Sequence, residues 1–437
     1  AGINVTASHN PKEYNGYKAY WTDGSQVTAP HDRNIIAEVE KITSIDQILT
    51  GANPGNITLL GEEFDEIYLN KVHTLSLSPE SVGKFHDMKI AYTPLHGAGV
   101  RLVPASLRKW GFTNVSLVEE QAVIDGNFPT VESPNPEERK TMAKAIELGS
   151  RLGADLVLAT DPDSDRIGVA LRNAKGEYVL LNGNQTLSLI MAYQLTRWSE
   201  LGRLDGKEFV VKTIVTSQMP NVMAAHFGVK CYDCLTGFKY IARIIRNNEG
   251  KATYIGGGEE SFGYLAGDFV RDKDAVSACS LVAEAAAWTR DTMGLTLYEW
   301  LQKLYVEFGF FREGLVSVVR KGMEGAAEIQ QMMVDYRADP PREIAGSPVV
   351  KINDFKLLES TDVRTGAKTP IEEEASNVLQ WFAADGTVVS VRPSGTEPKI
   401  KFYFGVRAEL ESVADFDRVE AGLDAKIETI KKELKLV

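Results

Sequence analysis

The stretch "DPDSDR", residues 161–166, places three carboxylates at alternate positions and a guanidinium directly after them. It follows an apolar run typical of a buried strand, and α/β folds bind ligands at the carboxyl ends of such strands. Three converging carboxylates repel one another unless a cation lies among them. Because oxygen ligands alone favour a hard ion, we interpret Asp161, Asp163 and Asp165 as a magnesium site.

Two other interpretations of this stretch compete with the magnesium site. An EF-hand loop needs glycine at its sixth position and glutamate at its twelfth, where this chain has Arg166 and Arg172, so that motif is excluded. An exposed acidic turn without a ligand remains the alternative. Arg166 favours the metal site over that alternative, because an arginine beside a metal suits a substrate phosphate.

A serine near the start of the chain is a candidate nucleophile. The stretch "TASHNP", residues 6–11, contains Ser8, and Lys18 follows in "NGYKAYW" as a possible proton carrier or phosphate contact. A serine near a turn is more often a cap or a hydrogen-bond filler. No Ser-His-Asp relay is readable here, because His9 is too close in the chain for that geometry to be assumed. Both interpretations of this loop therefore remain open.

The stretch "GGGEESFGYL", residues 256–265, is rich in glycine and carries Glu259 and Ser261. Glycines permit close backbone approach to a ligand, and glutamate and serine are suitable partners for sugar hydroxyls. A glycine-punctuated turn with solvated acids explains this stretch equally well.

The stretch "RPSGTEPKIKFYF", residues 392–404, combines cations with a short Ser-Gly-Thr turn. Such a turn can point successive N–H groups inward to hold an anion, and arginine adds a two-pronged contact. A plain surface turn is the alternative, but the density of phosphate-binding groups favours a phosphate site.

Two further patterns are weak. "GAGVRL" has Gly97 and Gly99 after a strand, but Leu102 replaces the third glycine of a dinucleotide-binding turn. Cys231 and Cys234 have C-x-x-C spacing, but no further zinc ligands are visible nearby, and we interpret them as strand residues.

Short apolar strands alternate with amphipathic helices along the chain, which indicates an α/β fold. Three segments repeat one arrangement: "AGINVTAS" from Ala1, "ADLVLATD" from Ala154 and "ATYIGGGE" from Ala252. Each begins with alanine and a β-prone run, reaches a polar residue seven positions on, and returns into a second apolar run. We therefore expect three strand–loop–strand units, each with different chemistry in its loop.

Strand–loop–helix–strand units precede the second and third copies but not the first. We therefore expect a chain that lacks the first half of domain one. From "FFREGLVSVV" onward the pattern indicates an α+β domain. The expected fold is three related α/β domains, the first incomplete, plus a C-terminal α+β domain. The expected boundaries are 1–86, 87–180, 181–306 and 307–437.

Composition bounds the class of protein. Hydrophobic residues at 43% and charged residues at 25% are ordinary for a globular protein, and no apolar run reaches a membrane-spanning length. A net charge of -12 argues against a nucleic-acid groove but allows small anionic substrates where cations gather locally. Three cysteines make no disulfide framework at this length, so we expect the reducing cytoplasm.

Together, "TASHNP", "DPDSDR", "GEESFG" and "RPSGTEPK" closely resemble the α-D-phosphohexomutase family, of the phosphoglucomutase/phosphomannomutase type. The four motifs occur in the family's order and cover essentially the whole chain. In that family four domains surround a central cleft and each contributes one loop. The resemblance implies that Ser8 carries the phosphoryl group, with Lys18 and Arg166 beside it, and that Asp161, Asp163 and Asp165 bind one Mg²⁺ together with a phosphate oxygen on Ser8. The implied substrate-binding residues are His9, Lys239, Glu259, Ser261, Lys273, Arg392, Ser394, Gly395, Thr396 and Lys399.

The implied activity is interconversion of a hexose 1-phosphate and a hexose 6-phosphate, of glucose or mannose, through a 1,6-bisphosphate that also serves as activator. A monomer or homodimer acting on a small phosphosugar is expected, with neither nucleic acid nor membrane as partner. Pentose phosphates remain possible substrates. A Mg²⁺-dependent phosphatase with an aspartate nucleophile is the rival enzyme, and a sugar-phosphate-binding fragment without turnover is the non-enzymatic alternative.

Overall fold

The computed structural model describes residues 1–51, 53–320, 322–394 and 398–436. Contacts divide the chain into two compact units. The first unit comprises residues 1–212, 227–232 and 237–298, and the second comprises residues 213–226, 233–236 and the chain from Glu299 onward. The boundaries expected for four domains stay a prediction.

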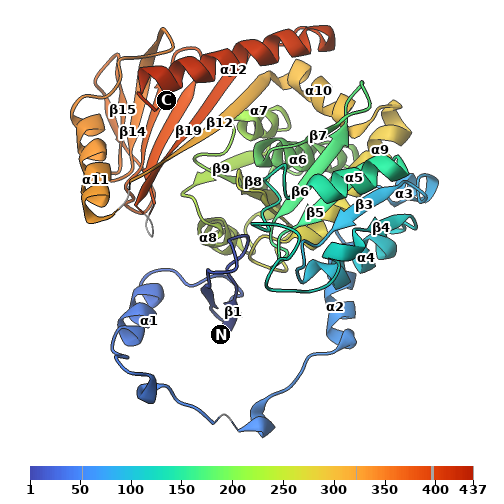
Figure 1. The fold of residues 1–437 in the computed structure, drawn as a ribbon. Coiled ribbons are helices and arrows are strands. Elements are labelled where there is room, and N and C mark those ends of the chain that lie inside the picture. Colours follow the sequence, from blue (N-terminus) through green and yellow to red (C-terminus); the bar gives the residue numbers. More distant parts are fainter. Residues whose placement is uncertain (52, 321, 395–397, 437) are drawn as a thin grey trace. The chain divides into compact units, whose positions relative to one another are not determined.

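The three predicted strand–loop–strand repeats are confirmed as three antiparallel hairpins in the first unit (Figure 1). In each of them the two strands pair up to the residues that flank the polar loop: Val5 with Tyr17, Thr160 with Ile167, and Glu259 with Gly263. The hairpins are β1 (Gly2–Val5) with β2 (Tyr17–Tyr20), β5 (Leu156–Thr160) with β6 (Ile167–Arg172), and β10 (Thr253–Glu259) with β11 (Gly263–Ala266).

The second and third hairpins belong to larger sheets with the same strand pattern. One sheet has the order β4-β3-β5-β6-β7 and the other β11-β10-β8-β9. In both, the first strand of the hairpin runs parallel to an earlier strand that lies beside it in the sheet, β3 or β8. The added strands are β3 (Ile90–Thr93), β4 (Val115–Leu117), β7 (Tyr178–Leu180), β8 (Glu208–Thr213) and β9 (Lys230–Cys234).

Helices cover these two sheets. Helix α6 (Gly183–Glu200) is buried almost all round rather than on one face, because it contacts both β10 and α9. The helices of the first unit are α1 (His31–Val39), α2 (Glu62–His73), α3 (Pro79–Lys84), α4 (Gly99–Trp110), α5 (Ala143–Leu152), α6 (Gly183–Glu200), α8 (Phe238–Asn248) and α9 (Ala275–Met293), with 3₁₀ turns at Ile45–Gln47, Pro54–Asn56 and Glu119–Gln121.

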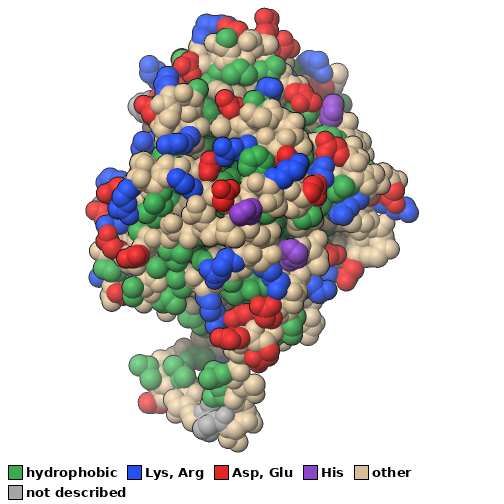
Figure 2. Space-filling model, turned by 90° about the vertical axis from the view of Figure 1, so that its right-hand side faces the viewer, with side chains coloured by type: hydrophobic (Ala, Val, Ile, Leu, Met, Phe, Trp, Pro, Cys, Tyr) green, Lys and Arg blue, Asp and Glu red, His purple; other side chains and the backbone are tan. Residues whose placement is uncertain are grey.

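The first hairpin differs from the other two, because β1 and β2 form a two-stranded sheet by themselves. An irregular stretch containing α1 joins this hairpin to α2 (Figure 1). Apolar side chains are exposed along it, including Ile45, Leu49 and Leu59. The space-filling view shows hydrophobic side chains on the surface of the lowest part of the molecule (Figure 2). Most side chains of β1 are exposed as well.

The second unit is an antiparallel sheet with helices packed against it, which confirms the predicted α+β class. Its strands follow the order β12-β19-β18-β17-β14-β15-β16, with β13 paired to β14. They are β12 (Phe310–Val319), β13 (Glu343–Ile344), β14 (Ser347–Asp354), β15 (Glu359–Asp362), β16 (Lys368–Pro370), β17 (Leu379–Ala383), β18 (Val388–Pro393) and β19 (Lys399–Ala408). The remaining helices are α7 (Met219–His226), α10 (Leu297–Phe308), α11 (Gly322–Ala338) and α12 (Phe416–Glu433), with a 3₁₀ turn at Val413–Asp415.

Helices α11 and α12 both contact β19, and aromatic rings form the core beneath them. Tyr336 packs against Trp381 and Phe402, while Phe416 stacks on Phe310. Within the described residues, no helix combines the length and the apolar character needed to cross a membrane.

Candidate active site

Three loops converge in the first unit. The first loop (residues 6–16) joins β1 to β2, the second loop (residues 161–166) joins β5 to β6, and the third loop (residues 260–262) joins β10 to β11. The second and third loops are linked by a backbone hydrogen bond, in which Ile167 N donates to Phe262 O over 3.0 Å. The first loop reaches the second through the side chain of Ser8.

Ser8 lies between an aspartate and a histidine. Its Oγ donates to Asp161 Oδ2 over 2.9 Å and lies 3.1 Å from His9 Nδ1. The backbone at Ser8 has a φ of 53°, in the left-handed region that a non-glycine residue rarely adopts, and its N–H donates to Thr6 Oγ1. Adjacent residues Ser8 and His9 therefore do contact each other, which sequence spacing did not allow us to assume. The left-handed backbone at Ser8 is strained, and strain of this kind is typical of functional loops.

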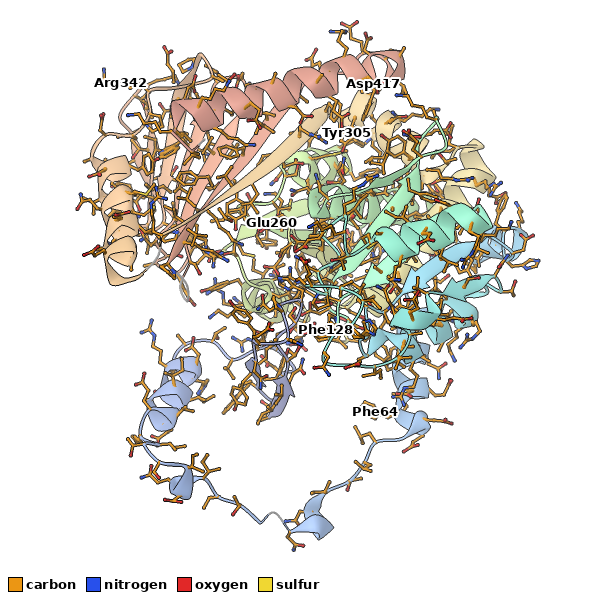
Figure 3. The ribbon with its side chains drawn as sticks, viewed as in Figure 1. Phe64, Phe128, Glu260, Tyr305, Arg342 and Asp417 are labelled. Carbon is orange, nitrogen blue, oxygen red and sulfur yellow. The ribbon has the colours of Figure 1, made fainter. Side chains whose placement is uncertain are left out.

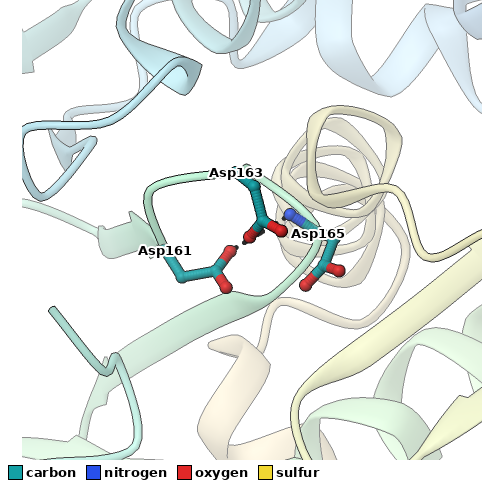
Figure 4. A group of neighbouring side chains, drawn as sticks. All are labelled: Asp161, Asp163 and Asp165. Atoms are coloured by element: carbon teal, nitrogen blue, oxygen red, sulfur yellow. Dashed lines mark hydrogen bonds between the residues drawn. The ribbon is translucent and has the colours of Figure 1, made fainter. Parts of the chain in front are cut away.

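The three aspartates of the second loop converge as predicted (Figure 4). One oxygen from each lies within 4.8 Å of those of the other two, and Asp161 is 0% exposed. Two backbone N–H groups, those of Asp165 and Arg166, donate to Asp161 Oδ1 over 3.1 and 3.0 Å. The turn of the loop itself thus orients the first carboxylate toward the other two.

This cluster fits a hard divalent cation. Asp163 Oδ1 and Asp165 Oδ1 are both buried and neither has a hydrogen-bond partner. A buried carboxylate oxygen without a partner is costly, and coordination of a cation would remove that cost. The donor set is made only of carboxylate oxygens, which suits Mg²⁺. The acidic triad is therefore a candidate metal site.

Three protein cations surround the triad. Lys18 Nζ lies 3.1 Å from Asp163 Oδ2 and 2.9 Å from Asp165 Oδ2, while Lys273 Nζ lies 3.1 Å from the same Asp165 oxygen. Arg166 Nε lies 3.8 Å from Asp165 Oδ1. The repulsion between the carboxylates is thus partly offset by residues drawn from all three hairpin regions.

These pairs shift the protonation equilibria of the residues involved. Burial lowers the pKa of Lys18, but the negative charges of Asp165 and Asp163 raise it by more, so its pKa lies above the ordinary value. Burial raises the pKa of Asp165, whereas Lys273 and Lys18 bring it down to about 2. Lys18 therefore carries its proton near neutral pH and acts as a cation or as a proton donor there.

Two glycines allow a neighbouring segment to pack closely against the second loop. A Cβ on Gly97 would clash with the backbone of Pro162, and one on Gly99 would clash with side chains that include Ser164 Oγ. Ala98 N also donates to Pro162 O over 2.8 Å. The "GAG" stretch therefore supports the aspartate loop by close approach, a role distinct from the dinucleotide turn that we considered weak.

The third loop carries the residues predicted to contact the sugar. Glu259 ends β10 and is buried; its Oε1 accepts from Gly237 N over 2.8 Å, and burial raises its pKa. Glu260, labelled in Figure 3, follows it, and Ser261 is half-buried. Gly183, the first residue of α6, approaches the carbonyl of Glu260 too closely for any Cβ. Helix α6 thus fixes this loop from behind.

The remaining predicted cations differ in placement. Lys273 is brought into the aspartate cluster, as described above. Lys239 lies in the first turn of α8, where its Nζ is 3.6 Å from Asp32 Oδ2. Its contact with a substrate stays a prediction.

The predicted phosphate loop joins β18 to β19 in the second unit. Arg392 pairs with Lys401 in the sheet, and Ser394 N donates to Lys399 O over 2.8 Å, which closes the hairpin. Arg392, Ser394 and Lys399 are all half-buried at this end. Gly395 and Thr396 lie outside the described residues. The role of this hairpin as a phosphate site stays a prediction.

Sequence reasoning missed three residues that support the site. Glu137 Oε1 lies 3.1 Å from Arg166 Nη1, and Ser133 Oγ donates to the carbonyl of His9 over 2.9 Å. Asp272 accepts from Lys273 and from two residues of the first hairpin region. Only Asp272 carried a sequence signal, because it directly precedes the cation Lys273.

Comparison with known proteins places all four parts of the chain in one family. The family models of phosphoglucomutase/phosphomannomutase match residues 1–46 as α/β/α domain I, 66–176 as domain II, 182–308 as domain III and 350–423 as the C-terminal domain. The four loops described above fall one in each of these matches.

Individual relatives agree with the family models. A phosphoglucomutase of Staphylococcus aureus strain MRSA252 is 34% identical over 431 residues, which are 98% of this chain and 75% of the relative. A crystal structure of a phosphoglucomutase/phosphomannomutase family protein from Burkholderia thailandensis matches with a TM-score of 0.64 and 16% identity, over 98% of this chain and 76% of that one. The phosphoglucomutase parafusin from Paramecium, in an open form, matches with a TM-score of 0.62 and 17% identity, over 99% and 77%.

These structures, at such low identity, show a shared fold, while the sequence matches show shared ancestry along almost the whole chain. The chain therefore belongs to the phosphoglucomutase/phosphomannomutase family and is an enzyme of intramolecular phosphoryl transfer on phosphosugars.

Proposed function

We propose that this enzyme interconverts hexose 1-phosphate and hexose 6-phosphate through a phosphoryl group carried on Ser8. The observation that carries the proposal is the contact of Ser8 Oγ with Asp161, 2.9 Å away, at the edge of a buried cluster of three aspartates and three cations. A serine of ordinary structural role needs no such surroundings. The names of the curated relatives favour glucose phosphates over mannose phosphates as the first substrate to test.

In the first half-reaction the P–O bond to Ser8 Oγ breaks and a P–O bond to a sugar hydroxyl forms, giving a hexose 1,6-bisphosphate. The hydroxyl loses its proton to a base and Ser8 Oγ leaves as an alkoxide that must be neutralised. In the second half-reaction the other phosphoryl group returns to Ser8 after the bisphosphate has turned end for end. Lys18 and Arg166 stabilise the charge that moves with the phosphoryl group in both steps.

Asp161, Asp163 and Asp165 would hold one Mg²⁺, together with an oxygen of the phosphate on Ser8. When bound, the ion supplies charge neutralisation at the transferring phosphoryl group. The protein itself holds the carboxylates in place. Backbone N–H groups orient Asp161, and the close approach of Gly97 fixes the loop from the side. Phosphoryl transfer depends mainly on such alignment and charge stabilisation.

Substrate recognition is divided between two further loops. Glu259 and Ser261 of the third loop would bind sugar hydroxyls, and Lys239 and Lys273 would add positive charge. Arg392, Ser394 and Lys399, together with Gly395 and Thr396 of the same sequence motif, would hold the phosphate that does not react. The sequence motifs support both assignments. A fixed phosphate contact and fixed sugar contacts accept either orientation of the bisphosphate.

The test is the intact mass of the protein after incubation with glucose 1,6-bisphosphate, with and without Mg²⁺. We expect one phosphoryl adduct on the wild type in the presence of Mg²⁺, and peptide mapping should place it on Ser8. Ser8→Ala should give no adduct. The matched control Ser116→Ala changes a serine of β4 in the same unit and should be phosphorylated like the wild type.

An adduct on an aspartate of the second loop, with release of free phosphate, would contradict the mutase and support the phosphatase alternative. Binding of the bisphosphate without any adduct, on protein with a cooperative thermal transition, would instead support the binding protein without turnover.

A further inference from the structure

We propose that Asp272 is a positioning residue for phosphoryl transfer, which ties the first hairpin to the aspartate cluster. This inference rests on the function proposed above. Asp272 touches neither the aspartates nor Ser8 directly. It acts through Tyr20 on one side and Lys273 on the other.

The carboxylate of Asp272 is fully engaged. Its Oδ2 accepts from Tyr20 Oη over 2.6 Å and from Gln26 Nε2 over 2.8 Å, and its Oδ1 accepts from Lys273 Nζ over 3.2 Å. Tyr20 and Gln26 face each other across an antiparallel bridge, so one carboxylate binds both strands of the turn that follows β2. Only 18% of the Asp272 side chain is exposed, which strengthens these charge-assisted hydrogen bonds.

These contacts form a closed series, or ring, that includes Asp165 of the candidate metal site. Lys18 and Tyr20 are two residues apart in β2 and therefore project from the same face of the strand. Lys18 forms an ion pair with Asp165, and Asp165 forms another with Lys273. Lys273 also pairs with Asp272, which accepts a hydrogen bond from Tyr20. Loss of Asp272 would open the ring on the side of the first hairpin and remove one of the two carboxylates paired with Lys273.

Polar contacts attach the first hairpin to the rest of the first unit. Among the described residues β1 and β2 form a two-stranded sheet, and such a sheet is marginal by itself. The position of Ser8 relative to Asp161 thus depends on polar contacts made by the hairpin and the turn after it. Because a displacement of about 1 Å can cost roughly a hundredfold in rate, the loss of one such contact is expected to be visible in catalysis.

The experiment measures the rate at which Ser8 is phosphorylated by glucose 1,6-bisphosphate in a single turnover with Mg²⁺. Asp272→Asn keeps the size of the side chain and removes its charge. We expect its rate at saturation to fall by about tenfold to a hundredfold, while the final adduct stays at one per chain and the half-saturating concentration changes little. Tyr20→Phe should give a smaller fall of the same kind.

A matched control separates positioning from general packing. Tyr68 Oη donates to Asp274 over 2.7 Å, a bond of the same type to the same segment, but from α2 rather than from the first hairpin. Tyr68→Phe should leave the phosphorylation rate within about twofold of the wild type. In the double variant with Asp272→Ala, which removes the acceptor of the Tyr20 hydroxyl, Tyr20→Phe should add almost nothing to the loss caused by Asp272→Ala.

Wild-type phosphorylation rates in both Asp272→Asn and Tyr20→Phe would overturn the inference, as would an equal loss in Tyr68→Phe. If Asp272→Asn does not fold, Tyr20→Phe, which removes only a hydroxyl, decides by itself. Absence of any Ser8 adduct in the wild type would instead overturn the proposed function, and the inference with it.

Discussion

The hairpins β5–β6 and β1–β2 present adjoining loops of one site, yet different forces hold them. Strand β5 lies in the middle of a five-stranded sheet and every residue of it is buried. Among the residues that the structure describes, strand β1 pairs only with β2, and most of its side chains are exposed. The aspartate loop is thus carried by a hydrophobic core, whereas the serine loop is held by hydrogen bonds and ion pairs to other loops.

This difference divides the demands of phosphoryl transfer between two regions. The candidate metal ligands must keep a fixed mutual geometry, and a packed sheet holds them with precision. The serine must meet that geometry from outside. The contacts of Ser8 with Asp161, of Lys18 with Asp165 and of Tyr20 with Asp272 provide the match. Polar contacts of this kind are directional, so they define position more sharply than apolar packing of a small hairpin would.

The largest expected effect compares one substitution in the two hairpins. Val157→Ala in β5 removes two methyl groups from a side chain that is 0% exposed and should lower the free energy of unfolding by about 2–4 kcal/mol. Val5→Ala in β1 changes a side chain that is 67% exposed and should cost less than about 0.5 kcal/mol. Urea denaturation of both variants measures the difference. Equal losses would show that β1 is packed as firmly as β5.

The second prediction concerns the support of the aspartate loop. Gly97→Ala places a Cβ against the backbone of Pro162 and should lower the free energy of unfolding by about 1–3 kcal/mol, with weaker Mg²⁺ binding. Gly83→Ala in α3 has open space around it and should be neutral or slightly stabilising. Thermal unfolding and titration with Mg²⁺ measure both effects. Unchanged Mg²⁺ binding in Gly97→Ala would mean that the loop adjusts freely.

The smallest effect is a pH dependence at the polar attachment. Burial raises the pKa of Asp272, but Lys273 and the hydrogen bonds from Tyr20 and Gln26 lower it more, so the folded pKa lies below the ordinary 3.8. A carboxyl with a depressed folded pKa stabilises the fold above its unfolded pKa, and that contribution is lost as the pH falls through the folded value.

Asp272→Asn should therefore lower the free energy of unfolding by about 1–2 kcal/mol at pH 6, and by less as the pH falls below 3.8. Denaturant curves across that pH range test the sign. A difference between variant and wild type that grows toward low pH would contradict the assignment of Asp272 as an ionised partner of Lys273.

Much of the fold was predictable from local patterns. The three hairpins follow from β-prone runs broken by polar loops at matching intervals. The burial of α6 on almost every side was not predictable, because it depends on contacts with β10 and α9, which lie far from α6 in the sequence.

The candidate site was predictable in its residue types but not in its connections. Alternate spacing in "DPDSDR" indicated converging carboxylates, and the structure brings them together. The contact between Ser8 and His9 depends on a left-handed backbone at Ser8, which no sequence pattern signals for a serine. The role of Gly97 depends on which loop approaches it in space, and a strand elsewhere in the chain supplies that loop.

The sequence by itself determined which chemical groups each loop carries: a serine hydroxyl, three carboxylates with a guanidinium, a glycine-rich turn with glutamate and serine, and a cationic turn. Short-range spacing suffices for that, because each loop is a continuous stretch. Only the tertiary structure decided which loops meet. Ser8 and Asp161 are 153 residues apart, and Tyr20 and Asp272 are 252 apart. Contacts across such separations arise from the packing of whole sheets and helices, which a local pattern does not encode.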